Sequence, residues 1–154
     1  MLILRPYRAR LEQNAIIKLI KEELIPLSHT IRKNDAAAIR DLPKQLRRGT
    51  TIVASRSKAA RPLGFIHFSV VNKQLFIEML VVHPEHRNKQ LGKLLMQAAE
   101  KHGLSKHCTS AVLYVDSGNE RAQGFYARLG YRTMIFVESL HCFQMEKPLG
   151  MLSF

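Results

Sequence analysis

Cysteine is scarce in this sequence and tryptophan is absent. Among 154 residues there are only two cysteines, Cys108 and Cys142. They form neither a CxxC pair nor a cysteine–histidine cluster with zinc spacing, which argues against a disulfide framework and against a structural zinc site. A chain of this length buries enough apolar surface to fold without such crosslinks. We therefore expect free thiols in a reducing compartment and no bound metal.

Long hydrophobic runs are also missing. No apolar segment approaches the roughly 20 residues that span a bilayer. The opening residues, MLILRPYRARLEQ, carry charge too early for a secretory signal peptide. The chain shows no internal repeat, low-complexity tract or linker. These absences predict a single domain over residues 1–154, located in the cytoplasm and without a membrane partner.

Acidic residues are few, with 12 Asp and Glu against 24 Lys and Arg, so the formal net charge is +12. Such a charge attracts anions in general, including nucleic acids and phosphorylated ligands. A basic nucleic-acid-binding protein is therefore one alternative. Against it, the seven phenylalanines fall on apolar stripes rather than between basic residues, where stacking on bases would need them. We expect an anionic ligand, and we do not expect nucleic acid as the partner.

Helical periodicity dominates the first third of the chain. Residues 8–25 place isoleucines and leucines at helical spacing, and Pro26 ends that pattern. A second helix begins at Asn34 or Asp35, either of which would cap it. Pro43 either kinks this helix or divides it in two.

Strand patterns follow from residue 50. The runs LGFIHFSVV and QLFIEMLVVHP are separated only by Asn72 and Lys73, which predicts a hairpin with a tight turn. The second run is almost unbroken apolar from Leu75 to Val82. That pattern is typical of a central strand covered on both faces.

The last half alternates between the two periods. Leucines and alanines at helical spacing follow Pro84 and stop at Gly103, and the strand SAVLYV comes next. Ser117 and Glu120 form a capping box that opens another helix, and two strands close the chain. The order β-α-α-β-β-β-α-β-α-β-β predicts an α/β fold with a mixed sheet of about seven strands flanked by helices.

The segment from Ile77 to Lys93 has the features of a diphosphate site. A strand ends at His83-Pro84, and a helix begins near Leu91 after a short loop. The free N–H groups and the positive dipole end of a helix start bind phosphate well. Basic side chains add charge, and a glycine lets the backbone approach closely. The residues predicted to contact the diphosphate are Arg87, Asn88, Lys89, Gln90, Leu91, Gly92 and Lys93.

This loop resembles the acetyl-CoA loop of the GNAT superfamily of N-acetyltransferases, R/Q-x-x-G-x-G/A after a strand ending V-x-P. Arg87 and Gly92 match, whereas Gln90 stands where the family usually has glycine. A negative φ at Gln90 would make this departure nearly neutral, and a positive φ would strain the loop or weaken cofactor binding. We expect the negative value.

A second motif strengthens the resemblance. Family members carry N-x-x-A-x-x-F-Y-x-x-x-G-F/Y on a later helix. The chain has Asn119, Ala122, Phe125, Tyr126, Gly130 and Tyr131 in that register. On both motifs the chain is identified as a member of the superfamily, and the resemblance covers about residues 50 to 147. It implies a mixed, mostly antiparallel sheet of about seven strands flanked by about four helices.

The resemblance also implies a reaction. A primary amine, on a small molecule, a lysine or a protein N-terminus, would attack the thioester of acetyl-CoA directly in a ternary complex. Tyr126 would protonate, or hydrogen-bond to, the departing sulfur, since a phenol with a pKa near 10 holds its proton at neutral pH; otherwise it is a core aromatic on the apolar stripe of its helix. Glu78 would be the base, with a pKa raised by burial; otherwise it pairs with a basic residue or positions the amine. His67 is a weaker candidate for the base.

Further contacts follow from the resemblance. The backbone of Leu80, Val81 and Val82 would pair with the pantetheine arm like an added strand. Asn119 would contact the cofactor or cap its helix, and Phe125 would pack around the cofactor. The apolar tail at residues 149–154 would form a homodimer contact or fold back on its own domain. A non-catalytic acyl-CoA-binding module remains an alternative.

Overall fold

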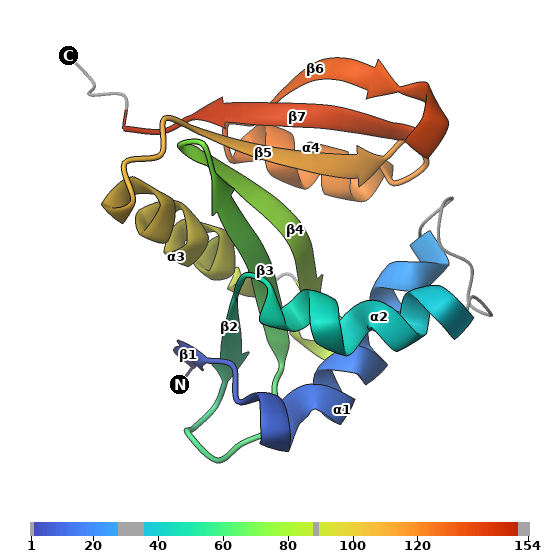
Figure 1. The fold of residues 1–154 in the computed structure, drawn as a ribbon, viewed down its shortest axis with the longest axis vertical. Coiled ribbons are helices and arrows are strands. Elements are labelled where there is room, and N and C mark those ends of the chain that lie inside the picture. The colour runs from blue at the N-terminus through green and yellow to red at the C-terminus, as the bar shows by residue number, and fades with distance from the viewer. Residues whose placement is uncertain (1, 28–35, 88–89, 151–154) are drawn as a thin grey trace.

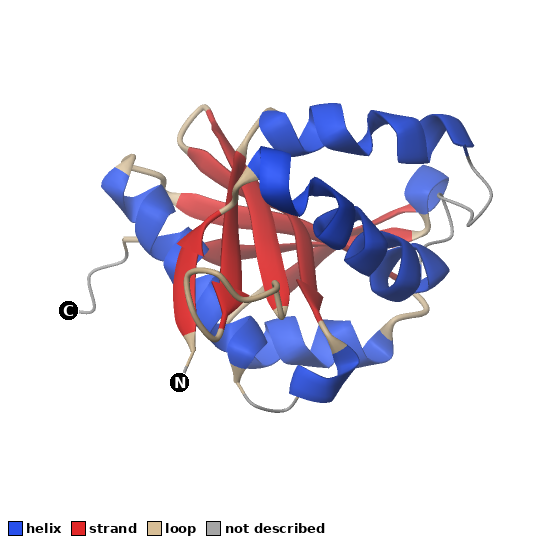
Figure 2. Cartoon of the chain, turned by 90° about the horizontal axis from the view of Figure 1, so that it is seen from below, coloured by secondary structure: helices blue, strands red, loops and turns tan. Residues whose placement is uncertain are grey.

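The computed structural model describes residues 2–27, 36–87 and 90–150, which form one seven-stranded sheet with helices on both faces (Figures 1 and 2). The strand order is β1-β2-β3-β4-β5-β7-β6. The strands are β1 (Ile3–Pro6), β2 (Thr50–Ser55), β3 (Gly64–Val71), β4 (Gln74–Val82), β5 (Ser110–Asp116), β6 (Arg132–Val137) and β7 (Cys142–Pro148). The helices are α1 (Ala9–Leu19), α2 (Ala36–Arg47), α3 (Leu91–Ser105) and α4 (Glu120–Arg128), with short turns η1 (Ile20–Leu24), η2 (Ile25–Leu27), η3 (Pro84–His86) and η4 (Glu138–Leu140).

The predicted fold class is confirmed. Every neighbouring pair of strands is antiparallel except β4 and β5, which run parallel. The long apolar run is strand β4, at the centre of the order, as its composition predicted. The predicted hairpin is also present, because Asn72 and Lys73 both take positive φ values, 50° and 61°, between β3 and β4. Two such residues in succession form the type I′ turn that matches the twist of paired strands.

Each face of the sheet has its own core. Helices α3 and α4 pack on one face, where Ile66, Phe68 and Leu95 are fully buried. Helices α1 and α2 cover the other face, where Ile16 and Phe65 are fully buried. Figure 2 shows the strands between these two groups of helices.

The N-terminal helices differ in detail from the prediction. Helix α1 ends at Leu19, and the chain continues through η1, a π-helical turn, and through η2 to Leu27. Pro43 neither divides nor ends α2, which runs through it. Because Leu42 and Leu46 are buried against the sheet, their packing offsets the lost backbone hydrogen bond. The expected caps Asn34 and Asp35 lie outside the described residues.

The predicted capping box of α4 was wrong. The N-cap is Asn119, whose Oδ1 accepts a hydrogen bond from the Ala122 N–H at 3.1 Å. The carbonyl of Ser117 instead accepts from the side chain of Gln123. The helix begins at Glu120, so a residue at position 117 lies too far upstream to cap it.

A buried ion pair ties α1 to the edge of the sheet. The Arg5 guanidinium donates to both carboxylate oxygens of Glu12, and its Nε donates to Ser55 Oγ at 3.0 Å. The backbone N–H of Arg8 donates to Glu12 as well. Burial by itself would raise the pKa of Glu12, but these hydrogen bonds and the Arg5 charge together lower it below the ordinary value.

We predict that Glu12→Gln destabilises the fold by about 3 kcal/mol at pH 7, because a buried guanidinium loses its counter-charge. The folded-state pKa of Glu12 is lowered, so its contribution exists above the unfolded value and is lost as the pH falls through the folded value. The difference in unfolding free energy between wild type and variant should therefore shrink below about pH 4.5. Urea melts across this range measure it, and the exposed Glu22→Gln is the control, expected within about 0.5 kcal/mol of wild type. A constant difference down to pH 3 would contradict the assignment.

Candidate functional site

Strands β4 and β5 are paired over only the first part of their length. The parallel ladder between β4 and β5 has four pairs, from Gln74 with Ser110 to Ile77 with Leu113. Beyond it, β4 stays paired with β3 as far as Val82, while β5 stays paired with β7 as far as Asp116. Figure 1 shows the resulting divergence between the β1–β4 group and the β5–β7–β6 group. Over residues 78–82, the side of β4 that faces β5 therefore has no strand partner.

A β-bulge marks the point of divergence. The register between β3 and β4 pairs His67 with Met79 but Phe68 with Ile77, so Glu78 is the extra residue. An inserted residue reverses the alternation of side chains along a strand. Before the bulge, Ile77 packs on the α3–α4 face; after it, Met79 packs on the α1–α2 face. The bulge thus breaks the regular pairing and directs Glu78 toward His67.

Glu78 lies among hydrogen-bonding groups rather than in an apolar pocket. Ser69 Oγ donates to its Oε1 at 2.8 Å, and His67 Nε2 lies 3.0 Å from its Oε2. Contact with His67 is the largest cause and lowers the pKa of Glu78; burial, the next largest, raises it, and the hydrogen bond from Ser69 lowers it further. The expectation of a raised pKa was wrong, because contacts with His67 and Ser69 outweigh the effect of burial on a carboxylate that is a third exposed.

Tyr126 lies on α4, on the other face of the sheet. Its ring packs edge-on against Phe125 and Tyr131, with centroids 5.2 and 6.0 Å away. Burial raises the pKa of Tyr126 to about 12. Among the described residues its hydroxyl has no hydrogen-bond partner, whereas the neighbouring Tyr131 hydroxyl donates to Glu100. The Tyr126 hydroxyl is thus a neutral donor available to a ligand.

Three elements converge at Gly92, in the first turn of α3. A Cβ built there would lie 3.1 Å from Cζ of Phe125 on α4 and 3.9 Å from Cδ2 of Leu80 on β4. Glycine therefore allows the start of α3 to approach the motif helix and the unpaired part of β4. The two motifs, separated by more than 20 residues in the sequence, meet at this point.

Gln90 is the N-cap of α3 and has φ 62° and ψ 12°. The expectation of a negative φ was wrong. Position 90 takes the left-handed conformation that glycine adopts freely and that costs other residues roughly 1 kcal/mol. The loop thus places a non-glycine residue in a conformation that strains its backbone.

The other predicted diphosphate residues differ in how they are placed. The Arg87 guanidinium is paired with Glu23 on η1 at 2.9 Å, so its charge is partly neutralised. Leu91 and Val81 are buried in the two cores, which leaves only their backbones for a ligand. Lys93 is exposed in the first turn of α3. Asn88 and Lys89 lie outside the described residues.

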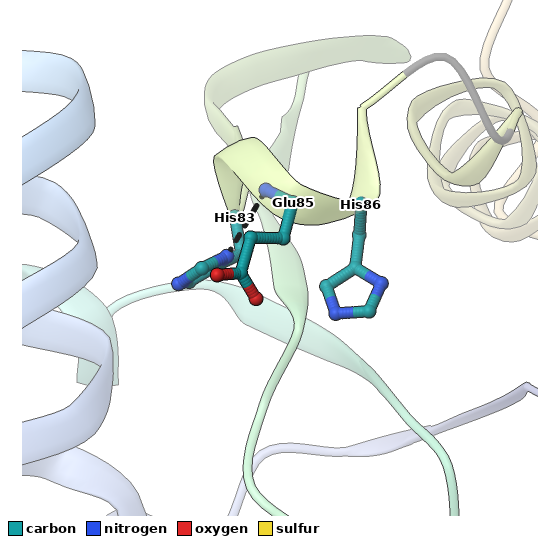
Figure 3. Close-up of side chains that lie close together, drawn as sticks. All are labelled: His83, Glu85 and His86. Carbon is teal, nitrogen blue, oxygen red and sulfur yellow. Dashed lines mark hydrogen bonds between the residues drawn. The ribbon is translucent and has the colours of Figure 1, made fainter.

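His83, Glu85 and His86 form a small cluster on η3, the turn that leads into this loop (Figure 3). Such residues could hold a metal ion, and their ligand atoms lie within 4.8 Å of one another. His83 Nδ1 also accepts a hydrogen bond from the Glu85 N–H at 3.2 Å. His83 is thus the N-cap of η3.

The remaining predictions on composition concern the thiols, the tail and the membrane. Cys108 and Cys142 are free. Leu149 is buried in its own domain against Gly103, so this part of the tail folds back. Within residues 2–27, 36–87 and 90–150, none of the helices has the length and apolar content that crossing a bilayer requires.

The model of the acetyltransferase (GNAT) family matches residues 16–131, three quarters of the chain. The chain belongs to this family. The match includes the bulged strand, the α3 loop and the α4 motif, so the predicted resemblance is confirmed.

Individual relatives of this GNAT chain are more distant. Thialysine N-epsilon-acetyltransferase of Bos taurus is 30% identical over 74 residues, which is 48% of this chain and 44% of the relative. The corresponding Sus scrofa protein is 28% identical over 82 residues, 53% of this chain and 48% of the relative. The match thus spans less than half the length of these relatives.

Solved GNAT structures agree with the fold over almost the whole chain. The PaiA N-acetyltransferase of Thermoplasma acidophilum, solved in complex with coenzyme A, has a TM-score of 0.80 at 20% identity, covering 96% of this chain and 99% of that one. At that identity the likeness supports the fold alone.

Sequence reasoning missed three residues around Glu78. Thr51 Oγ1 lies 2.8 Å from Nδ1 of His67, Ser69 contacts Glu78, and Gly49 lies against the His67 ring. None belongs to a motif. The sequence did contain one sign of such partners, which is the polar His67 within the apolar run GFIHFSVV. A histidine inside a buried strand requires polar partners.

Proposed function

We propose that this chain transfers the acetyl group of acetyl-CoA to a primary amine by direct attack in a ternary complex. The observation that carries the proposal is the divergence of β4 and β5 between Glu78 on one face and Tyr126 on the other. A thioester lying between the strands would meet an amine from the α1–α2 face and a hydrogen-bond donor from the α3–α4 face.

Acetyl-CoA would bind along the unpaired side of β4. The backbone groups of residues 80–82 would pair with the amides of the pantetheine arm as a neighbouring strand does. The diphosphate would then meet the N–H groups at the start of α3, where Gly92 permits close approach and Lys93 adds charge. Phe125, which packs beside Gly92, would form the wall next to the diphosphate.

Glu78 would act on the acceptor as an ionised group. A carboxylate with a lowered pKa is charged at neutral pH and attracts an ammonium ion. It would accept a proton from the substrate ammonium, directly or through a water molecule. The neutral nitrogen would then bond to the carbonyl carbon as the carbon–sulfur bond breaks, and the proton left in excess on that nitrogen would pass to solvent. Its role as base thus comes from position and charge, not from a raised pKa.

Tyr126 would act on the departing sulfur. Its pKa of about 12 lies above that of an alkyl thiol, near 8.5, so complete proton transfer to the thiolate is uphill. A hydrogen bond from the neutral phenol would instead stabilise the negative charge as it forms on sulfur. Solvent would supply the final proton.

The acceptor is proposed by class only. The similarity to thialysine N-epsilon-acetyltransferases favours the terminal amine of a small amino-acid-like molecule. The net charge of +12 disfavours polyamines, which the positive field would repel.

The function is tested by incubating the protein with acetyl-CoA and a panel of amines and measuring the free thiol released. The panel should include thialysine, lysine, neutral amino acids, spermidine and peptides with free N-termini. Thiol release that depends on both substrates is the expected result. Binding of acetyl-CoA without thiol release from any amine would favour the non-catalytic module.

We predict that Gln90→Gly binds acetyl-CoA as well as the wild type or up to about fivefold more tightly, since glycine removes roughly 1 kcal/mol of left-handed strain. Calorimetric titration measures the affinity. Lys73→Gly is the matched control: it relieves the same strain in the β3–β4 turn, away from the α3 loop, and should leave the affinity unchanged. A large loss of affinity in Gln90→Gly would show that the glutamine side chain contacts the cofactor.

A further inference from the structure

His67 is the one histidine among the described residues that is completely buried. An imidazole without solvent needs partners, since a buried polar group without hydrogen bonds costs several kcal/mol in stability. Its Nδ1 lies 2.8 Å from the hydroxyl of Thr51, itself buried on β2. Its Nε2 lies 3.0 Å from the Glu78 carboxylate. Within the described residues these two groups are its polar partners.

The contact between His67 and Glu78 indicates which ring nitrogen of His67 carries a proton. Nε2 and a carboxylate oxygen would repel each other at 3.0 Å if both offered only lone pairs, so Nε2 carries the proton. The N–H does not point straight at the oxygen, and Nε2 falls short of a well-aligned hydrogen bond. The interaction is therefore largely electrostatic. At this distance, in a buried setting, it still favours the ionised carboxylate.

The surrounding backbone holds the ring in place. A Cβ at Gly49 would lie 2.4 Å from the carbonyl oxygen of Phe68 and 3.1 and 3.2 Å from two atoms of the His67 ring. Only glycine fits there, so the chain before β2 closes directly over the imidazole. The Nε2 atom that this Cβ would approach is also the atom that faces Glu78, the extra residue of the β-bulge. This enclosure leaves the ring little freedom to rotate away from the carboxylate.

We propose that Thr51 and His67 form a buried positioning chain that holds Glu78 ionised and directed at the acceptor amine. The inference rests on the proposed function, because it gives His67 a task in that reaction. Thr51 orients the imidazole, His67 fixes one carboxylate oxygen, and Ser69 fixes the other. His67 itself touches neither substrate; it is a positioning residue. The exposed third of Glu78 is the part left to meet the amine.

The test is a carbon-13 NMR titration of the Glu78 carboxyl group in the intact protein. Wild type should titrate below the ordinary glutamate value. His67→Leu should raise the Glu78 pKa, because the favourable contact is lost and the desolvation remains. His67→Gln, which can still donate toward the carboxylate, should restore part of the shift. An unchanged Glu78 pKa in folded His67→Leu overturns the proposal.

Steady-state kinetics give the second readout. We expect His67→Leu to lower kcat/KM for the amine about tenfold or more while leaving acetyl-CoA affinity unchanged, as for a misplaced base. Thr51→Val should lower it about fivefold, the value of one hydrogen bond, and Thr51→Ser should restore activity. The exposed His107→Gln is the control and should match wild type. Equal activity in Thr51→Val and wild type would remove Thr51 from the chain.

The two assays separate this proposal from the proposed function. The NMR titration needs no turnover, so a shifted Glu78 pKa together with an absence of thiol release would reject the reaction and retain the contact. Thiol release by wild type together with an unshifted Glu78 pKa in His67→Leu would retain the reaction and reject the positioning role of His67. If His67→Leu fails to fold, Thr51→Val carries the same titration, since it is isosteric and removes only the hydroxyl.

Discussion

Replacing Tyr126 with phenylalanine is expected to lower kcat by about 100-fold, the usual loss when one preorganised donor to a developing anion is removed. The ring would keep its packing against Phe125 and Tyr131, so the cofactor wall is preserved. The affinity for acetyl-CoA should therefore stay within about twofold of wild type, because the donor acts on charge that forms only in the transition state. Thiol release measures kcat, and calorimetry measures affinity.

Tyr7→Phe is the control for this change. Tyr7 lies between β1 and α1 and packs against the core under the N-terminal helices, on the other face of the sheet from Tyr126. Its hydroxyl is expected to have no effect on turnover. A wild-type rate in Tyr126→Phe with a good acceptor would remove the hydrogen bond to sulfur from the mechanism. A selective loss of acetyl-CoA affinity would give Tyr126 a binding role instead.

Glu78→Gln is expected to lower kcat/KM for the amine by about 100-fold at pH 7, within the range for loss of a general base. The substitution keeps the side-chain shape but removes the charge that attracts an ammonium ion. The deficit should shrink as the pH rises toward the amine pKa, near 10, because an amine that is already neutral needs no base. In the wild type the lowered pKa keeps Glu78 ionised throughout pH 5 to 9.

The pH–rate profiles of the two proteins, compared with the exposed Glu138→Gln as a control, measure this effect. Glu138→Gln should follow the wild-type profile. A deficit of the same size at pH 7 and pH 10 would mean that Glu78 positions the amine without accepting its proton. An undiminished rate at pH 7 would exclude both roles.

Fold and motifs were readable from the sequence because their signals are local. Apolar residues that alternate every second position predicted the strands, and apolar residues repeating every 3.6 positions predicted the helices. The dipeptide Asn72-Lys73 predicted the hairpin turn between two strands. The meeting of the α3 loop and the α4 motif at Gly92 was not predicted, because it depends on how two helices pack in the folded chain. Caps were less predictable, since Ser117 and Asn119 are both good N-caps and the helix start decides between them.

The electrostatics of Glu78 could not be read from the sequence. An apolar run with one carboxylate predicts burial and a raised pKa. The bulge changes this, because one extra residue in β4 brings the side chain to His67 and Ser69 and lowers the pKa. A bulge depends on the register between two strands, which no single strand encodes. The positive φ of Gln90 was hidden for a similar reason, since glutamine does not signal the left-handed conformation that the loop requires.

The central claim is that the start of α3 holds the diphosphate of acetyl-CoA while its acyl arm lies along the unpaired part of β4. The most direct test is a calorimetric comparison of acetyl-CoA with S-acetylpantetheine, which has the same arm and thioester but no diphosphate. We expect acetyl-CoA to bind with one-to-one stoichiometry and at least about 100-fold more tightly, the value of two charge-assisted hydrogen bonds. Equal affinities, or no heat from acetyl-CoA with the folded protein, would contradict the account.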